Sequence, residues 1–306
     1  MKRLSLLGLE LDIRARRKGE QPLSLDDLRE LNDETIRYVR SLTESELSSR
    51  VSEVTVASIA DVSAINATLE THGIVIVPDF IKEESVSAIA GAINSLQSMI
   101  EDFARSSEAF REQENYLLQK GACKVSGYDS LTEYGKPVIQ IRDGQDSGMV
   151  DVFNIDHLFQ DFRDIIRPAY EQSPISHILG ATSHQLRAKN LNLYVNSGIT
   201  RTRGFHVDAY RKKLKSFIYL SDVLSLDDGP YTYVKGSHVD SAYRRINQTL
   251  SRHLPNRTET PVVSLDSIIP AIARKGTLVI SDQGGSHRGF PQQPGHARMV
   301  SVMNYS

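Results

Sequence analysis

The chain has 306 residues, of which 36 are basic and 38 acidic, so its formal net charge is −2; it contains one cysteine and no tryptophan. This composition is ordinary for a globular protein and excludes low-complexity disorder, collagen-like repeats and a disulfide scaffold. The balanced charge gives no reason to expect nucleic acid or a membrane surface as a partner. The length fits either two domains or one β-barrel with added segments.

The N-terminal sequence predicts neither a signal peptide nor a membrane anchor. A short apolar run follows Lys2 and Arg3, but Glu10 and Asp12 interrupt it and no small-residue cleavage site follows. No stretch approaches the ~18 consecutive apolar residues that a membrane span needs. We therefore expect a cytoplasmic location, with which the single thiol of Cys123 is compatible.

The first part of the chain is expected to be mostly helical. Apolar residues recur there at roughly helical spacing, and Ser24 is a suitable N-cap. The segment is polar enough to lie on a surface. We assign residues 1–70 to a helical N-terminal extension that packs on the core.

The middle of the chain mixes strands and helices. Residues 73–80 form a short apolar run that stops at Pro78, which predicts a buried strand, and the 3.6-residue spacing of residues 82–105 predicts an amphipathic helix. Residues 106–135 are polar and weakly patterned, and we expect a helix and a loop there. Further strands are expected near 138–142 and 150–155, and helices near 157–171 and 174–179.

From residue 186 the pattern changes to strands separated by glycine-containing turns. Strands are predicted at 187–196, 202–209, 213–222, 230–235, 276–282 and 297–305. Residues 238–275 are interpreted as an insert, with a helix near 240–252 followed by a loop. This organisation favours one compact domain over residues 71–306, mainly β with helical elaborations, with a β-barrel or jelly roll as its core.

Two residues of the predicted strand 202–209 carry metal-ligand side chains. His206 and Asp208 occupy alternate positions, so both side chains would point to one face, although a surface strand with two polar residues is an alternative explanation. His287 follows an apolar strand, at a position where a rigid barrel can present a ligand. Two histidines and one carboxylate form the facial triad of non-haem Fe(II) oxygenases, which leaves three of six octahedral positions open.

Arg298 lies eleven residues after His287, on a strand whose alternation places Arg298, Val300 and Val302 on one face. An arginine inside an apolar barrel is costly unless a carboxylate pairs with it. A dicarboxylate that chelates the metal with its keto-acid end could bring its far carboxylate to this guanidinium. A structural salt bridge is the alternative interpretation.

The set His206-x-Asp208, His287 and Arg298 resembles the Fe(II)/2-oxoglutarate-dependent dioxygenases, and more narrowly the phytanoyl-CoA dioxygenase-like family. Four further stretches resemble the same family: THGIVIVPDFI (71–81), LNLYVNSGITRTRGFHVDAY (191–210), KSFIYLSDVLSLDDGPYTYVKGSH (215–238) and GTLVISDQGGSHRG (276–289). The resemblance covers about residues 70–306 and is nearly silent on the substrate.

The resemblance implies a double-stranded β-helix in which His206, Asp208 and His287 hold one Fe(II). 2-Oxoglutarate would chelate the iron, with its distal carboxylate on Arg298, and would react with O₂ to give succinate and CO₂ while a small-molecule metabolite is oxidised. Related halogenases lack the carboxylate, so Asp208 favours hydroxylation, desaturation or another oxidation over halogenation.

Three more residues are candidates for binding the co-substrate. Asn192 and Tyr194 alternate with apolar residues, and they face either the site or the solvent. Thr202 would share the face of His206 if the strand were regular. We assign Asn192, Tyr194 and Thr202, together with Arg298, to co-substrate binding.

A basic cluster flanks the proposed metal ligands. Residues 201–215 contain six basic side chains and one acidic one, a local balance of +5 in a chain of net charge −2. The cluster suggests an anionic small-molecule substrate, contacted by Arg203, Arg211 and Lys212. A solvated turn between strands is the alternative.

Two other functions remain open at this stage. One is a non-catalytic metabolite-binding barrel or a differently metallated one such as a zinc hydrolase, and Arg298 argues against it because a hydrolase needs no carboxylate anchor. The other is a protein hydroxylase, in which residues 106–135 and 238–275 would form a platform rather than a lid. The sequence predicts an enzyme acting on a small molecule, without nucleic acid or membrane, and leaves its oligomeric state open.

Overall fold

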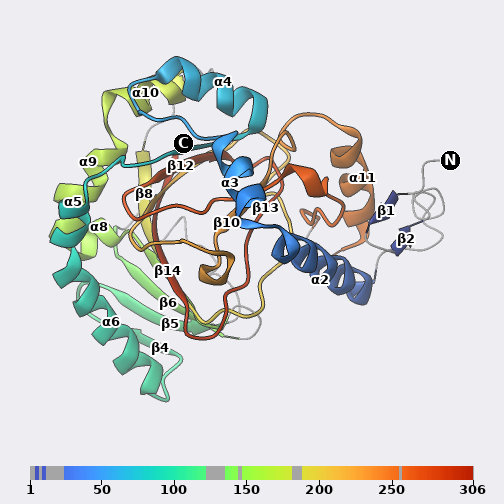
Figure 1. Cartoon of the computed structure of the whole chain (residues 1–306). Helices are drawn as coiled ribbons and strands as arrows, with labels where there is room; N and C mark the ends of the chain where they lie inside the picture. The colour runs from blue at the N-terminus through green and yellow to red at the C-terminus, as the bar shows by residue number, and fades with distance from the viewer. Residues whose placement is uncertain are drawn as a thin grey trace.

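The computed structural model describes residues 4–6, 9–11, 24–121, 135–143, 147–180, 188–254 and 257–305. Figure 1 shows a β-structure wrapped on one side by helices. The strands form a nine-stranded sheet, a three-stranded sheet and a small separate pair, β1 (Leu4–Leu6) with β2 (Leu9–Leu11). No helix within the described ranges is long and apolar enough to cross a membrane.

The larger sheet has the strand order β3-β12-β9-β14-β8-β7-β6-β5-β4, and its neighbouring strands are antiparallel except for β5 and β6. Its strands are β3 (Ile74–Val77), β4 (Phe110–Glu112), β5 (Leu117–Gly121), β6 (Val138–Arg142), β7 (Met149–Phe153), β8 (Ala188–Ser197), β9 (Leu214–Tyr219), β12 (Leu278–Asp282) and β14 (Ala297–Tyr305). The smaller sheet, in the order β11-β10-β13, consists of β10 (Tyr231–Val234), β11 (Ile268–Pro270) and β13 (His287–Gly289).

The two sheets face each other across a hydrophobic interior. Phe217 and Val300 of the larger sheet belong to the same buried cluster as Tyr231, Tyr233 and Ile269 of the smaller sheet. Aromatic and β-branched side chains suit such pleated surfaces because they pack well against neighbours on the same face. The facing sheets form the double-stranded β-helix, or jelly roll, that the sequence predicts.

Helices cover the outer face of the larger sheet. Leu96 and Phe103 of α6, Phe162 of η2 and Tyr170 of α9 pack with outward side chains such as Leu193. Figure 1 shows this layer along the left of the molecule. The helices are α2 (Leu25–Ser41), α3 (Glu44–Ser52), α4 (Val62–His72), α5 (Glu83–Ala88), α6 (Ala90–Arg105), α8 (Ile155–Leu158), α9 (Arg167–Tyr170), α10 (Ser173–Gly180) and α11 (Ala242–Leu250), with the π-helix η2 (Phe162–Ile166) and the 3₁₀ turns η3 (Leu226–Asp228), η4 (Ser251–His253) and η5 (Leu265–Ser267).

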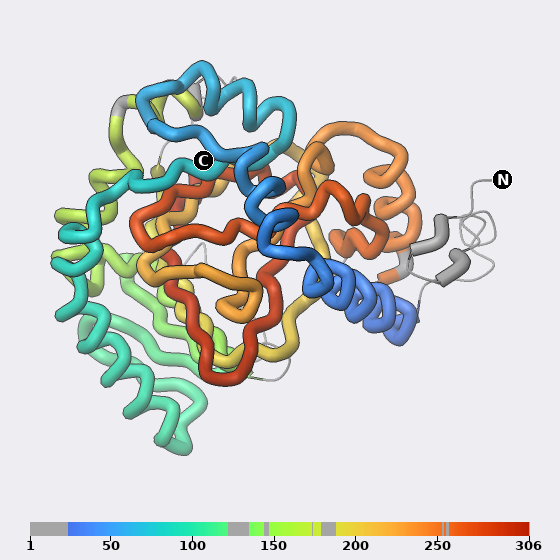
Figure 2. The backbone as a smooth tube through the Cα atoms, viewed as in Figure 1, coloured from blue at the N-terminus to red at the C-terminus, as the bar shows by residue number. Residues whose placement is uncertain are grey.

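The N-terminal helices lie against the C-terminal half of the chain, as the blue and orange segments of Figure 2 show. Ser24 caps α2 in a capping box with Asp27, which confirms the predicted cap. Tyr38 of α2 donates a hydrogen bond to Asp266 (3.0 Å), and Arg50 of α3 donates to the carbonyl oxygen of Leu265 (2.8 Å). These contacts hold α2 and α3 against the segment around η5.

Four secondary-structure predictions are wrong. In the described part of residues 106–135, two strands, β4 and β5, are found where a helix was expected, because β5 (LLQKG) pairs with β4 and with β6, and its short sequence does not predict these partners. The single helix predicted over residues 82–105 is divided into α5 and α6 at Ile89. Residues 202–209 are not a regular strand, as described below. The C-terminal part of the stretch interpreted as an insert supplies β11, which pairs with β10.

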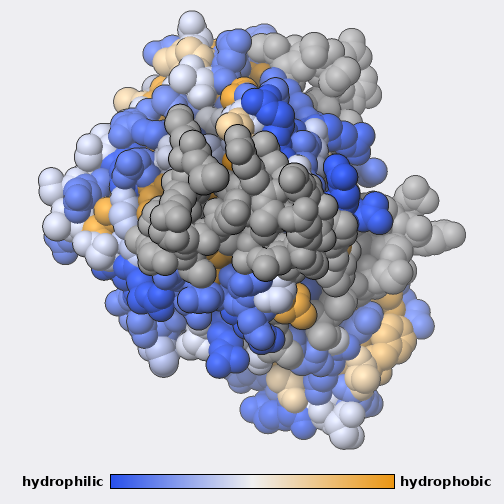
Figure 3. Space-filling view, turned by 90° about the vertical axis from the view of Figure 1, so that its right-hand side faces the viewer, coloured by the Kyte–Doolittle hydropathy of each residue, from blue (hydrophilic) through white to orange (hydrophobic). Residues whose placement is uncertain are grey.

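The residues coloured in Figure 3 are mostly hydrophilic. Figure 3 shows hydrophobic side chains only in small separate patches among the coloured residues of that face. Among the described residues, the exposed large hydrophobic side chains are Leu25, Phe110, Leu224, Val239 and Tyr243, which come from separate elements. Scattered exposed apolar residues of this kind are normal.

Candidate metal and co-substrate site

The loop between β8 and β9 carries His206 and Asp208, and its backbone bonds change partner at almost every residue. His206 exchanges two backbone hydrogen bonds with His287 (3.0 and 2.9 Å), whereas the next amide, that of Val207, donates to Thr258 (2.9 Å). The Asp208 amide donates to Gln283, just beyond β12 (3.0 Å). A regular strand needs one continuous partner, so the predicted strand 202–209 is reduced to isolated bridges at His206.

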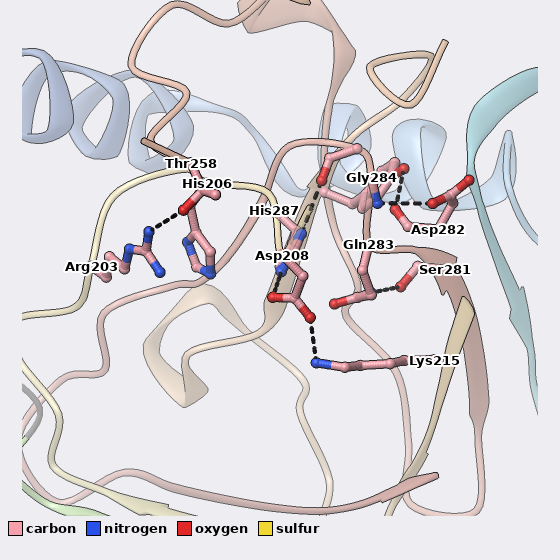
Figure 4. Close-up of polar contacts among 12 residues, drawn as sticks. Arg203, His206, Asp208, Lys215, Thr258, Ser281, Asp282, Gln283, Gly284 and His287 are labelled. Atoms are coloured by element: carbon pink, nitrogen blue, oxygen red, sulfur yellow. Dashed lines mark hydrogen bonds and ion pairs between the residues drawn. The ribbon is translucent and has the colours of Figure 1, made fainter. Parts of the chain in front are cut away.

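The side chains of His206, Asp208 and His287 nevertheless converge, as Figure 4 shows. One ligand atom from each lies within 4.8 Å of the others, and among the described residues this is the one group so placed to hold a metal ion. The two imidazole ring centroids are 4.7 Å apart. His287 Nε2 lies 3.7 Å from Asp208 Oδ1. The sequence prediction that brings these three residues together therefore agrees with their placement.

Both histidines are oriented to present Nε2. The Nδ1 of His206 lies 2.9 Å from the carbonyl oxygen of Gly204, and the Nδ1 of His287 lies 2.9 Å from that of Gly285. A carbonyl oxygen only accepts, so each Nδ1 carries a proton and Nε2 is the ring atom left to bind a metal. Burial, reinforced by the neighbouring His287 and Arg203, holds the pKa of His206 well below its usual range. The ring is thus neutral, as a metal ligand must be.

Asp208 forms an ion pair with a lysine whose role the sequence did not predict. Lys215 Nζ lies 2.6 Å from Asp208 Oδ2. Burial by itself would raise the pKa of Asp208, but the ammonium of Lys215 and the side chain of His287 outweigh it and keep the pKa well below its usual range. The carboxylate is therefore ionised and ready to act as a ligand.

Arg298 is buried and lacks the salt bridge that the alternative interpretation requires. It is 7% exposed, its Nη1 donates to the carbonyl oxygen of Gly229, and its Nε has no hydrogen-bond partner. Within the described ranges no carboxylate lies at ion-pair distance from it, in contrast to Arg142, which Asp151 binds at 2.6 Å. Burial lowers the pKa of Arg298. An unpaired buried guanidinium is a ready site for an anion.

Gly289 leaves room beside this guanidinium. It lies two residues after His287 in β13, so both positions share one face of the strand. A Cβ added there would meet only Nη2 of Arg298 within 4 Å, at 3.6 Å, and Gly289 is not among the glycines with positive φ. The missing side chain therefore opens space between the metal ligands and Arg298 rather than relieving backbone strain.

Asn192 and Tyr194 lie on the inner face of the larger sheet. They are opposite Val302 and Val300 of β14, and therefore share the face of Arg298. Asn192 Oδ1 accepts a hydrogen bond from the Asn154 amide (3.2 Å). Burial raises the pKa of Tyr194 to about 12, with Lys215 acting in the opposite direction. Of the two orientations left open by the sequence, the structure has the one that points into the barrel.

Thr202 lies behind β13. Its hydroxyl donates to the carbonyl oxygen of Gly289 (2.8 Å) and accepts from Arg288 Nη2 (2.6 Å). Its one hydroxyl hydrogen is thus already used, so the structure places Thr202 as a support of β13 rather than as a donor to a co-substrate. The irregular backbone of residues 202–209 removes the shared face with His206 on which the sequence assignment depended.

In the folded structure, acidic side chains neutralise part of the basic cluster's charge. Arg203 Nε binds Glu259 at 2.8 Å, and its Nη2 donates to Thr258 (2.9 Å), as Figure 4 shows in part. Lys215 is bound to Asp208, while Arg211 and Lys212 are exposed. The balance of +5 omitted Glu259 because that residue lies in the distant stretch 238–275. The exposed positive charge of the cluster therefore lies at Arg201, Arg211 and Lys212 rather than at Arg203.

The positions of Lys215 and Gly289 follow from strand alternation, whereas that of Glu259 does not. Lys215 alternates with Phe217 and Tyr219 on β9, and a lysine in phase with buried aromatic residues points inward. Gly289 follows His287 by two residues, so a glycine on the ligand face was visible. Glu259 gave no signal, because its pairing with Arg203 depends on how residues 238–275 fold back.

Comparison with known proteins finds solved structures of similar fold. No family model and no curated protein matches the chain. Similar solved structures are the epimerase SnoN in complex with Fe³⁺, α-ketoglutarate and nogalamycin RO (TM-score 0.50, 14% identity, 81% of this chain and 84% of that chain) and the non-haem α-ketoglutarate-dependent carbocyclase SnoK from nogalamycin biosynthesis (TM-score 0.50, 17% identity, 78% and 81%). AviO1 from Streptomyces viridochromogenes Tue57 is similar at a TM-score of 0.50 and 14% identity, over 82% of this chain and 96% of that chain.

At these identities the likeness shows the fold. The chain has the double-stranded β-helix architecture of the α-ketoglutarate-dependent enzymes SnoN and SnoK. The narrower resemblance to the phytanoyl-CoA dioxygenase-like family is not confirmed by these comparisons.

Proposed function

We propose that this protein is a non-haem Fe(II)/2-oxoglutarate-dependent oxygenase that oxidises a small-molecule metabolite. One observation carries the proposal: a convergent His206, Asp208 and His287 share the barrel with Arg298, a buried guanidinium that no carboxylate pairs with in the described residues. A metal-binding barrel with another task has no use for that second feature. Residues 71–306 would form the oxygenase domain and residues 1–70 a mostly helical extension, in which β1 and β2 form a strand pair that the prediction of a helical segment did not include.

The residues of the site fit both Fe(II) and 2-oxoglutarate. Two imidazoles and one carboxylate are the donor set of non-haem iron sites, and Arg298 Nε lacks a partner that a distal carboxylate would supply. When bound, the iron would supply the oxidising chemistry, in which 2-oxoglutarate and O₂ give succinate and CO₂. The resemblance to phytanoyl-CoA dioxygenase-like proteins supports the same assignment.

The protein itself would position the co-substrate and exclude water from the site. Arg298 would anchor the distal carboxylate, and its planar fork fixes the direction of that carboxylate as well as its distance. Asn192 and Tyr194, on the same inner face, would line the co-substrate pocket. Phe217, Tyr219 and Val300 pack the interior beside it and keep water out, which protects a reactive site from side reactions.

The substrate is proposed to be a small molecule. The structure of SnoN holds nogalamycin RO together with α-ketoglutarate, so the fold can enclose a small-molecule substrate. SnoN is an epimerase and SnoK a carbocyclase, so the outcome of oxidation varies on this fold. For this chain we propose hydroxylation, in the cytoplasm, with the exposed Arg211 and Lys212 available to an anionic group of the substrate.

The test is anaerobic reconstitution of the full chain with Fe(II) and 2-oxoglutarate, followed by O₂ and measurement of succinate. Succinate should form even without substrate by uncoupled turnover, and a parallel sample loaded with Zn(II) should form none. A metabolite pool with ¹⁸O₂ then tests hydroxylation, because one labelled oxygen atom should enter the product. Bound Fe(II) and 2-oxoglutarate with no succinate would instead show a metabolite-binding protein.

A further inference from the structure

Lys215 occupies the interior of the barrel beside the proposed metal ligands. It lies on β9 opposite Ser281 of β12 and two positions before Phe217, whose side chain belongs to the buried cluster between the sheets. Side chains at alternate strand positions share a face, so Lys215 also points inward. Its side chain is 14% exposed. A lysine held this deeply needs a compensating contact.

The contact it makes divides the two oxygens of Asp208 between different partners. Lys215 Nζ is 2.6 Å from Oδ2, whereas Oδ1 is the oxygen near His287 Nε2. Figure 4 shows the carboxylate with one oxygen directed to each. A metal held by the two imidazoles would therefore find Oδ1 open to it and Oδ2 already bonded to an ammonium.

We infer that Lys215 sets the denticity of Asp208, by holding Oδ2 so that the carboxylate gives a metal only Oδ1. The inference rests on the proposed metal site. Carboxylates bind metals through one oxygen or through both, and an ammonium at hydrogen-bond distance from one oxygen favours the first mode.

Denticity decides how many coordination positions remain. With one oxygen from Asp208, the three ligands occupy three of six octahedral positions; with both oxygens they occupy four. A keto acid that chelates through its ketone and carboxylate oxygens takes two positions. Lys215 would thus keep one coordination position free after the keto acid has bound. A bidentate Asp208 would fill that position.

The same geometry argues against a role in strengthening metal binding. An ammonium beside a divalent cation repels it and competes for the carboxylate. Lys215 is therefore a positioning residue that acts through Asp208. Removing its charge should leave metal affinity intact or raise it, whereas loss of a merely structural support should lower that affinity.

The test counts the water molecules bound to Mn(II) in the full-length protein by water-proton relaxation. The wild type should hold three exchangeable waters and Lys215→Met two, because Oδ2 then joins the metal. Lys215→Arg should keep three, since guanidinium also binds Oδ2. The matched control is Lys275→Met, which removes a lysine from a pair with Glu83 outside the site (2.5 Å) and should behave as wild type.

Each result has a defined meaning. Three waters in Lys215→Met, or loss of Mn(II) binding by that variant alone, would overturn the inference. Binding of 2-oxoglutarate, measured on the same samples, should persist in Lys215→Met, because two coordination positions still remain for the keto acid. A wild type that binds Mn(II) but no 2-oxoglutarate would refute the proposed function, while the water counts still decide the role of Lys215.

Discussion

Gly289 and Arg298 face each other inside the barrel: a Cβ on Gly289 would lie 3.6 Å from Nη2 of the guanidinium. His287 is on the same face of the same strand, two residues earlier. The position without a side chain thus lies between a proposed metal ligand and the proposed carboxylate anchor. Any molecule that spans the two must use the space that Gly289 leaves.

Gly289→Val should therefore block the co-substrate and spare the metal. Overpacking costs typically 1–3 kcal/mol, so the Kd for 2-oxoglutarate should rise about 10- to 100-fold while the Kd for Mn(II) stays unchanged. Titration calorimetry measures both. The control is Gly91→Val on α6, where nothing lies within 4 Å of an added Cβ. Unchanged 2-oxoglutarate binding in Gly289→Val would remove Gly289 from the pocket.

Arg298→Met should separate stability from ligand binding. Replacing an unpaired buried charge by an apolar side chain of similar length should leave the free energy of unfolding unchanged or raise it. The same change should abolish the stabilisation that 2-oxoglutarate gives to the metal-loaded wild type. Urea unfolding with and without 2-oxoglutarate measures both effects.

Arg142→Met is the matched comparison for that experiment. Arg142 is also a buried arginine, but Asp151 binds it and is fully buried. Its loss strands a carboxylate and should destabilise the protein by about 3–5 kcal/mol. If Arg298→Met proves equally destabilising, Arg298 has a structural partner and is not a vacant anchor.

The proposed ligands should be individually essential. Alanine at His206, Asp208 or His287 should weaken Mn(II) binding beyond the ~10–100-fold that loss of an outer-shell partner costs, and should stop succinate formation. His296→Ala is the control, because His296 pairs with Asp228 (2.8 Å) away from the cluster. Equilibrium dialysis measures the metal. Retention of tight binding by any of the three alanine variants would exclude that residue as a ligand.

The sequence predicted the fold and the grouping of the three proposed metal ligands from strand alternation together with the family resemblance. Strand alternation located β8 closely, and β6 and β14 at the predicted residues. The side chains of His206 and Asp208 need only extended backbone to converge. They therefore lie together although the predicted strand is not regular. Arg298 was recognised from its phase with Val300.

What the sequence could not show depends on long-range contacts. β5 is a strand because it pairs with β4 and β6, and nothing in its own five residues requires those partners. Thr202 was assigned to the site from the parity of a regular strand, and the change of backbone partners along residues 202–209 directs it behind β13 instead. Arg203 seemed free because Glu259 is distant in sequence.

The N-terminal helix α2 should contribute to the stability of the metal-site strand. Arg288 follows His287 in β13 and is 1% exposed; it donates to Oδ1 of Asn32 in α2 and packs near the Phe205 ring, 5.6 Å from its centroid. Burial lowers the pKa of Arg288 to about 10, so the side chain is still charged at neutral pH. A hydrogen bond to a charged group contributes about 1.5–3 kcal/mol.

Asn32→Ala should therefore lower the free energy of unfolding by about 1.5–3 kcal/mol, measured by circular dichroism in urea. The control Glu30→Ala removes an exposed side chain from the same helix and should change stability by no more than ~0.5 kcal/mol. Equal stability of the two variants would show that α2 rests on β13 without supporting it.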